Sequence, residues 1–213
     1  VDFSISFWSS YSAQAVTFPK EADSLLNIQG NSRHPAKIFF PPCKDSYVAE
    51  YSAGKNYGGS SHLFCNRFQG PGDIYRSLIQ FDFSCLGGNY IPPGSDIVSA
   101  KLLLHLIRNE TREATTLSAY MIKQHWHEYT VNWNKQPLYT NTPADTITIQ
   151  PGYMGLILLD VTALARGWYD GSFINLGLVL KGPEDRDGIL GFYSRDHEDS
   201  TLRPRLAVEY HAA

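Results

Sequence analysis

The sequence lacks both a long apolar run and a cluster of basic residues. A helix that spans a membrane needs about 18 or more consecutive apolar residues, and no apolar stretch in the 213 residues approaches that length. A surface that binds nucleic acid needs clustered Lys and Arg side chains to neutralise phosphates, whereas Lys and Arg are scattered here and the formal net charge is -3. We therefore expect no membrane span and no nucleic-acid partner.

Cysteine is also scarce, and the three residues, Cys43, Cys65 and Cys85, lack the close pairs that zinc sites use. An odd number allows one disulfide and one free thiol, and three buried free thiols fit the sequence equally well. If the strands predicted over 45–51 and 62–68 are antiparallel neighbours, the end of the second returns near the start of the first. The disulfide candidate is therefore Cys43 with Cys65.

Helical periodicity is confined to one short segment. In DVTALARGWYDG the apolar residues Val161, Leu164, Ala165 and Trp168 recur at helical spacing, which predicts a short helix near 162–169. Aromatic residues that favour strands are abundant, with 13 Tyr and 11 Phe. The remainder of the chain is therefore expected to form strands and turns.

Ten segments between turn sequences predict strands: 45–51, 62–68, 75–83, 99–107, 116–123, 146–149, 155–161, 174–181, 189–195 and 205–211. The segments 99–107 and 155–161 are apolar over consecutive residues, which predicts strands at the centre of a sheet. The whole pattern predicts an all-β fold, a jelly-roll-like β-sandwich with one short helix and an additional strand at the N-terminus.

No arrangement of residues typical of catalysis is evident. The GxSxG motif is absent, and a Ser, His and Asp set would have to be assembled without a recognisable context. His125 and His127 would share one face of a strand and could hold zinc, but Glu128 would point the other way and the sequence assigns no third ligand. We therefore predict a protein that is not an enzyme and uses no cofactor.

Two acidic loops contain the oxygen ligands that calcium prefers. Neither matches an EF-hand loop, and acidic turns on a protein surface are usually solvated, so no metal site is predicted and calcium binding stays an alternative. The residues concerned are Glu184, Asp185 and Asp187 in one loop and Asp196, Glu198 and Asp199 in the other.

Three motifs, WHEYTVNWNKQP, NYGG and FYSRDHEDS, have structural interpretations. Trp126 and Trp133 are large apolar side chains with one N–H donor each, which suits anchors at the edge of a sandwich. Gly58 and Gly59 are expected to allow positive φ in a tight connection. Arg195 stands beside acidic residues and is expected to tie its own loop together. None of the motifs combines a nucleophile, a base and an oxyanion site.

These motifs, together with YRSLIQFDFS, IPPGSDIVSAKLLLHL and LDVTALARGWYDG, resemble the disaggregatase-related repeat domain, the DNRLRE type, which is related to carbohydrate-binding module family 96. The resemblance covers about Ile38 to His211. It implies an extracellular or cell-surface, non-catalytic β-sandwich, found in large surface proteins of prokaryotes or attached to polysaccharide-active enzymes. Sugar binding would use exposed aromatic rings, and Tyr129, Tyr153, Trp168 and Tyr169 lie in or near loops, but the carbohydrate-binding residues stay unassigned.

The N-terminal segment lies outside this resemblance. Val1, Phe3, Ile5 and Phe7 alternate with polar residues, which is the pattern of a strand with one buried face. The chain is accordingly divided into three parts: an extension strand over 1–18, a polar linker over 19–37 and a β-sandwich domain over 38–213.

A terminal strand of this kind can pack on its own domain or complete the sheet of a neighbouring copy. Our main hypothesis from the sequence is a structural subunit that self-assembles into a cell-surface filament or matrix by donating residues 1–18 to the next copy. The alternative is a carbohydrate-binding module with a polysaccharide partner. Because the chain starts at Val1 rather than Met, we expect that an export signal has been removed and that the protein is extracellular or on the cell surface.

Overall fold

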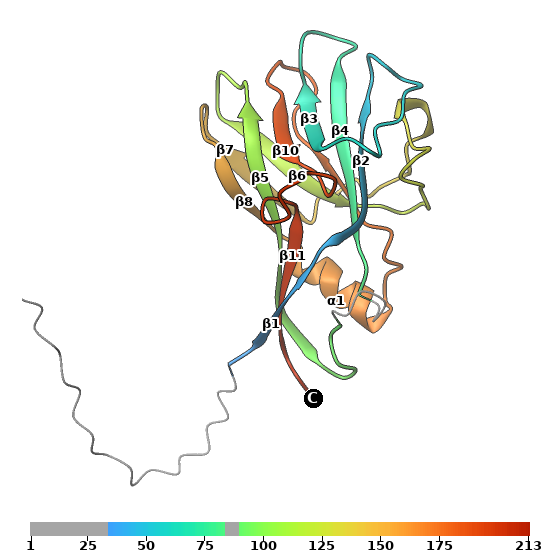
Figure 1. Ribbon diagram of the computed structural model, residues 1–213, viewed down its shortest axis with the longest axis vertical. Helices are drawn as coiled ribbons and strands as arrows, with labels where there is room; N and C mark the ends of the chain where they lie inside the picture. The colour runs from blue at the N-terminus through green and yellow to red at the C-terminus, as the bar shows by residue number, and fades with distance from the viewer. Residues whose placement is uncertain (1–33, 84–89) are drawn as a thin grey trace, which may run out of the picture. The chain divides into compact units, whose positions relative to one another are not determined.

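The computed structural model describes residues 34–83 and 90–213, which fold as one curled antiparallel β-sheet whose two halves face each other, with one short helix (Figure 1). The first half contains β1 (Ala36–Phe40), β11 (Arg205–His211), β5 (Asp96–Asn109), β8 (Gly155–Asp160), β10 (Leu190–Tyr193) and β3 (His62–Arg67). The second half contains β2 (Pro42–Ala49), β4 (Ile74–Phe81), β9 (Leu178–Lys181), β6 (Thr115–Met121) and β7 (Asp145–Ile149). The predicted all-β, sandwich-like fold is confirmed.

The main core lies between the two halves, and β5 shows how the sequence forms it. Leu102, Leu104 and Leu106 are at most 1% exposed, whereas the residues between them are partly exposed. This period of two is the signature of a strand with one face in the core. Phe81 of β4 in the second half and Phe192 of β10 in the first half add large side chains to this core, and both are fully buried. Burial of apolar area is therefore what holds the halves together.

Two features connect the halves. The chain leaves β1, which pairs with β11, and enters β2, which pairs with β4, across the single residue Pro41. The strand β3 belongs to both halves, because its residues up to Cys65 pair with β10 whereas Asn66 and Arg67 pair with β4. The change of partner occurs at Asn66, whose φ of 75° lies in the left-handed region that Asn tolerates.

The predicted helix is confirmed as α1 (Thr162–Asp170). It ends at Gly171, whose φ of 80° is the left-handed conformation that favours glycine after a helix. The Thr162 hydroxyl oxygen accepts a hydrogen bond from the Ala100 N–H at 2.9 Å, which fixes the start of the helix against β5. Trp168 faces the core and is 8% exposed.

All ten predicted strand segments overlap an observed strand, but two expectations about position were wrong. The strand over 155–161 was expected at the centre of a sheet, whereas β8 pairs only with β5 among the described strands and exposes Leu156 and Leu158 on its outer face. The first strand was missed, because residues 36 and 37 were assigned to the linker and lie in β1. The predicted extension strand over 1–18 lies outside the described residues.

The outer face of the second half is covered by the segment 122–139, which builds a second apolar cluster. Val48 of β2 and Leu78 of β4 face outward there and are at most 1% exposed. They pack with Trp126 and Val131 of the covering segment. The segment therefore acts as a third layer over half of the sandwich.

The strand pairing that suggested a Cys43–Cys65 disulfide is wrong, because β4 lies between β2 and β3. Both cysteines are free thiols in the structure, and Cys85 lies outside the described residues. The exposed Cys43 thiol donates a hydrogen bond to the Gln80 carbonyl oxygen at 3.3 Å. The Cys65 thiol is fully buried and donates to the Leu180 carbonyl oxygen at 3.2 Å, and burial raises its pKa to about 12.

These environments predict a difference in reactivity. Because the thiolate is the reactive form, we expect iodoacetamide at mildly alkaline pH to alkylate Cys43 in the native protein and to leave Cys65 unmodified until the protein is denatured. Peptide mass spectrometry of native and denatured samples measures both sites. Equal modification of Cys65 in the two samples would contradict the buried environment of its thiol.

Candidate functional site

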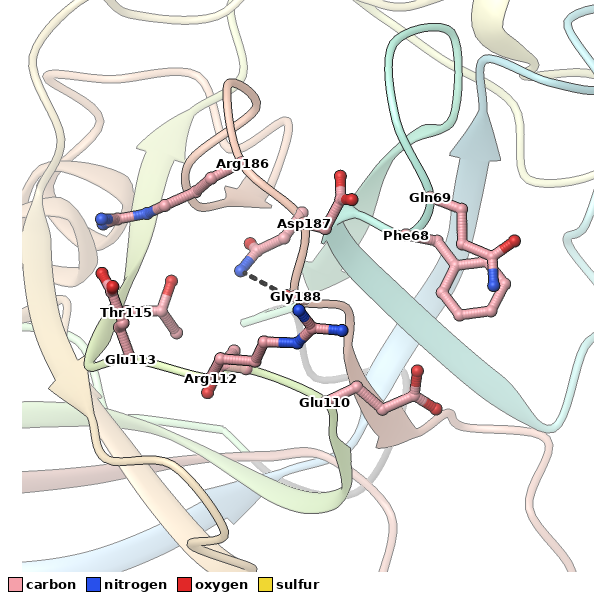
Figure 2. Close-up of a pocket in the computed structure, with 11 residues that line it drawn as sticks. Phe68, Gln69, Glu110, Arg112, Glu113, Thr115, Arg186, Asp187 and Gly188 are labelled. Atoms are coloured by element: carbon pink, nitrogen blue, oxygen red, sulfur yellow. Dashed lines mark hydrogen bonds between the residues drawn. The ribbon is translucent and has the colours of Figure 1, made fainter.

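A polar cleft of about 400 Å³ opens at the end of the sandwich, where three connections meet (Figure 2). Phe68 follows β3, Arg112 and Glu113 belong to the β5–β6 connection, and Arg186 belongs to the β9–β10 connection. Figure 2 shows the side chains of Arg112 and Arg186 extending from these two separate loops. The cleft is therefore assembled from segments that are distant in the sequence.

The floor of the cleft is fixed by hydrogen bonds at the end of β3. The buried Asn66 donates from its side-chain amide to the Gly188 carbonyl oxygen at 3.2 Å. The Gly188 N–H in turn donates to the Arg67 carbonyl oxygen at 2.9 Å. Gly188 has a φ of 147°, and a Cβ there would approach Thr111 to 3.0 Å. This position therefore requires glycine for both backbone conformation and space.

Two acidic side chains in the walls are already neutralised. Asp187 Oδ1 accepts hydrogen bonds from the Gly70 N–H at 2.9 Å and from Arg67 Nε at 2.6 Å, and these contacts hold its pKa below the usual range. Arg108 Nε pairs with Glu110 Oε1 at 2.7 Å. The Arg108 guanidinium also lies 4.7 Å from the centre of the Phe68 ring. These pairs hold the walls in place.

The three remaining charged side chains of the cleft are available to a ligand. Arg112, Glu113 and Arg186 are exposed, and their side chains make no hydrogen bond or ion pair with any residue in the described ranges 34–83 and 90–213. A guanidinium presents several N–H donors in a fixed fork, and a carboxylate offers two acceptor oxygens. The cleft can therefore bind a ligand rich in oxygen atoms.

The three motifs noted in the sequence converge at a different corner. Arg195 Nη1 lies 2.9 and 3.0 Å from the two carboxylate oxygens of Glu128. Glu128 Oε1 also accepts from the Asp45 N–H at 2.8 Å. The Asn56 amide donates to the main-chain oxygens of Glu128 and Val131 at 2.8 and 2.7 Å. The motifs are therefore parts of one structural junction, and Arg195 ties three segments together rather than its own loop alone.

The two tryptophans anchor the covering segment as expected. Trp126 is 4% exposed and donates from Nε1 to the Leu176 carbonyl oxygen at 2.9 Å. The Trp133 ring lies 4.6 Å below the guanidinium of Arg76, which also makes two hydrogen bonds with Glu184 at 2.7 and 2.9 Å. Both rings therefore have a packing role, and each also contacts a polar group: the Leu176 carbonyl oxygen for Trp126 and the Arg76 guanidinium for Trp133.

The expectation of positive φ at Gly58 and Gly59 was wrong, since neither residue adopts it. Gly58 instead allows its segment to pass close to the main chain of Glu128. A Cβ there would lie 2.3 Å from the main-chain oxygen of Glu128, whereas a Cβ at Gly59 would meet nothing within 4 Å.

The two acidic loops do not gather their residues as a calcium site would require. Glu184 is paired with Arg76 and Lys181, and Asp187 with Arg67. Asp199 accepts hydrogen bonds from Thr201 within its own turn. Asp185 and Glu198 are exposed on the same loops, while Asp196 lies beside Asp45 and Glu128 at the motif junction. The exposed His125 and His127 line a second shallow hollow and belong to no cluster of potential ligands in the described part of the chain.

The four aromatic residues considered for sugar binding fall into two pairs. Tyr129 and Tyr153 are 66% and 45% exposed. Trp168 packs in the core, and the Tyr169 hydroxyl donates to the Pro92 carbonyl oxygen and accepts from the Ser95 N–H. None of the four lines the polar cleft.

Sequence reasoning missed the cleft. Its charged residues occur in RNETRE and KGPEDRDG, which read as turns, and nothing local shows that the two turns meet. The proposed interaction residues Val1, Phe3, Ile5 and Phe7 lie outside the described residues and are neither placed nor tested. In the described part of the chain, no helix is long and apolar enough to cross a membrane.

Comparison with known families gives one match. The model of carbohydrate-binding module family 96 matches residues 36–210, which include every described strand from β1 to β10 and nearly all of β11. A search of curated proteins finds no match. The matched range agrees with the resemblance noted in the sequence and starts at β1. The chain belongs to carbohydrate-binding module family 96.

Proposed function

We propose that the protein binds a polysaccharide in the polar cleft. The observation that carries this proposal is the set of Arg112, Glu113 and Arg186, three exposed charged side chains without ion-pair partners among the described residues, in a module of a carbohydrate-binding family. Sugars present many hydroxyl oxygens, and acidic sugars add carboxylate or sulfate groups. Guanidinium donors serve both kinds of group, and a carboxylate accepts from hydroxyls.

The walls support this function because their acidic side chains already have partners. Asp187 and Glu110 are held by arginines, so a ligand does not have to break these ion pairs to reach the loops that carry Arg112 and Arg186. The Phe68 ring adds one apolar surface for the face of a sugar ring. Binding to a preformed site loses less affinity to the ordering of side chains and loops.

The wider role that we propose is that of a non-catalytic, extracellular module that holds its protein on a polysaccharide. Family membership supports this role. Self-assembly through residues 1–18 stays a prediction from the sequence, since those residues lie outside the described ranges, and neither the fold nor the family match adds support for it. Removal of an export signal likewise stays an expectation.

The polysaccharide proposal is tested by affinity electrophoresis in gels that contain neutral, carboxylated or sulfated polysaccharides. We expect at least one polysaccharide to retard the wild-type protein. The double variant R112A/R186A should bind at least tenfold more weakly, because a hydrogen bond from a charged donor contributes about 1.5–3 kcal/mol and 1.4 kcal/mol corresponds to a factor of ten.

Two controls locate the site. Lys123→Ala removes an exposed positive charge outside the cleft and should leave binding unchanged. Lys135→Ala removes a cation from the second shallow hollow, and loss of binding in this variant alone would place the site there. A double variant that binds like the wild type, or a wild-type protein that no polysaccharide retards, would refute the proposal.

A further inference from the structure

Three carboxyl groups meet one arginine at the motif junction. An oxygen atom from each of Asp45, Glu128 and Asp196 lies within 4.8 Å of the others. Asp45 is 1% exposed and Glu128 is 8% exposed, whereas Asp196 is exposed. The facing cation is Arg195, which pairs with Glu128. If all three carboxyl groups were ionised, three negative charges would face the one positive charge of Arg195. The junction would then carry two excess negative charges in a position with little access to water.

Lys44 removes this imbalance only in part, because its charge also interacts with Glu128. It lies on the same strand as Asp45, but its ammonium group donates to the Trp126 carbonyl oxygen at 2.7 Å and lies 4.3 Å from the centre of the Trp126 ring. It makes no ion pair with a carboxylate of the described residues. The charged groups that face Asp45 from the packed segments are therefore Glu128, Arg195 and Asp196.

We propose that the Asp45 carboxyl of the folded protein keeps its proton at mildly acidic pH values where an exposed aspartate is ionised, and that this proton makes the contact between β2 and the segments that follow β6 and β10 sensitive to pH. When the pH rises and the proton leaves, an unbalanced negative charge appears beside Glu128 and Asp196. The repulsion weakens the contact among the three segments.

The distribution of hydrogen-bond donors assigns the proton to Asp45. Glu128 receives hydrogen bonds from the Arg195 guanidinium and from the Asp45 N–H. Asp196 is exposed to water. Among residues 34–83 and 90–213, the Asp45 carboxyl group receives a hydrogen bond only from the Arg195 N–H, at 2.7 Å from Oδ2. Burial, aided by the neighbouring carboxylates, raises the pKa of Asp45 to about 7.

The direction of the pH effect follows from this assignment. An aspartate in an unfolded chain has a pKa of about 3.9, so between about pH 4 and pH 7 the folded protein holds a proton that the unfolded chain has released. Because proton binding by the folded state alone favours folding, stability contributed by Asp45 is complete below about pH 4 and is lost as the pH rises toward 7. Above that range the contribution stays constant.

Denaturant unfolding of the wild-type protein and of Asp45→Asn at several pH values tests the proposal. Asparagine imitates the protonated side chain but cannot titrate. We expect the unfolding equilibrium constant of the wild type, relative to that of D45N, to rise by up to tenfold per pH unit between pH 5 and 7 and to change little above pH 8. A constant ratio across this range would overturn the proposal.

Asp160→Asn is the matched control. Partial burial would raise the pKa of Asp160, but the Lys101 ammonium and the Thr162 hydroxyl outweigh it and lower the pKa to about 2. Its replacement should therefore leave the slope between pH 5 and 8 unchanged. Carbon-13 NMR of the aspartate carboxyl groups provides a direct reading in the wild type, even if D45N fails to fold. A wild-type spectrum in which every aspartate titrates below pH 5 would also overturn the proposal.

Discussion

Replacing Trp126 with alanine is expected to lower the free energy of unfolding by about 3–5 kcal/mol, the usual loss for a buried Trp or Phe. Trp126 is 4% exposed and packs with Val48 and Leu78 in the cluster under the covering segment. Its Nε1 also satisfies the Leu176 carbonyl oxygen. Truncation would leave both a cavity and a buried acceptor without a partner. Denaturant unfolding followed by circular dichroism measures the change.

Trp126→Phe separates the two contributions. Phenylalanine keeps most of the apolar volume and loses the N–H donor, so a smaller loss of about 1–3 kcal/mol is expected from the unsatisfied carbonyl group. If W126A proved no less stable than W126F, the ring would not be an anchor of the covering segment.

The second large effect is expected at Gly58. A methyl group there would lie 2.3 Å from the Glu128 main-chain oxygen and 2.7 Å from its carbonyl carbon, so Gly58→Ala must push two segments apart. Overpacking of this kind costs about 1–3 kcal/mol. Thermal unfolding should show a clearly lowered Tm for the variant.

The neighbouring glycine provides the control. Gly59 has open space around its Cα and no positive φ. Gly59→Ala should therefore be neutral, or slightly stabilising through the lower entropy of the unfolded chain. Equal losses in G58A and G59A would mean that the close approach to Glu128 is not the cause.

The strands and the helix could be predicted because their signals are local. Alternation in β5 and helical spacing in α1 depend on neighbouring residues, and each pattern reports which face is buried. The position of a strand in the sheet is not local. The apolar run of β8 predicted a central strand, yet this strand exposes Leu156 and Leu158. Among the described strands it pairs with β5 alone, and this pairing depends on the topology of the whole sheet rather than on the local sequence.

The site could be predicted only in part, for a related reason. Glu128 and Arg195 belong to motifs noted in the sequence, but their contacts with each other and with Asp45 depend on three segments that only the fold brings together. Arg112 and Arg186 occur in ordinary polar turns, and the role that we propose for them follows only from the cleft that the two turns line together. The sequence therefore indicated residues with a structural role, but it did not indicate which of them contact one another.

The pairing of β1 with β11 has a consequence for how the domain is made and joined to other segments. Ala36 pairs with Tyr210 and Phe40 with Leu206, so the first described strand is completed by the last one (Figure 1). During synthesis, β1 cannot pair with β11 until nearly the whole domain has left the ribosome. Once formed, the same pairing brings both boundaries of the domain to one edge of the sheet, an arrangement that allows a module to be inserted into a longer chain with little disturbance of its neighbours.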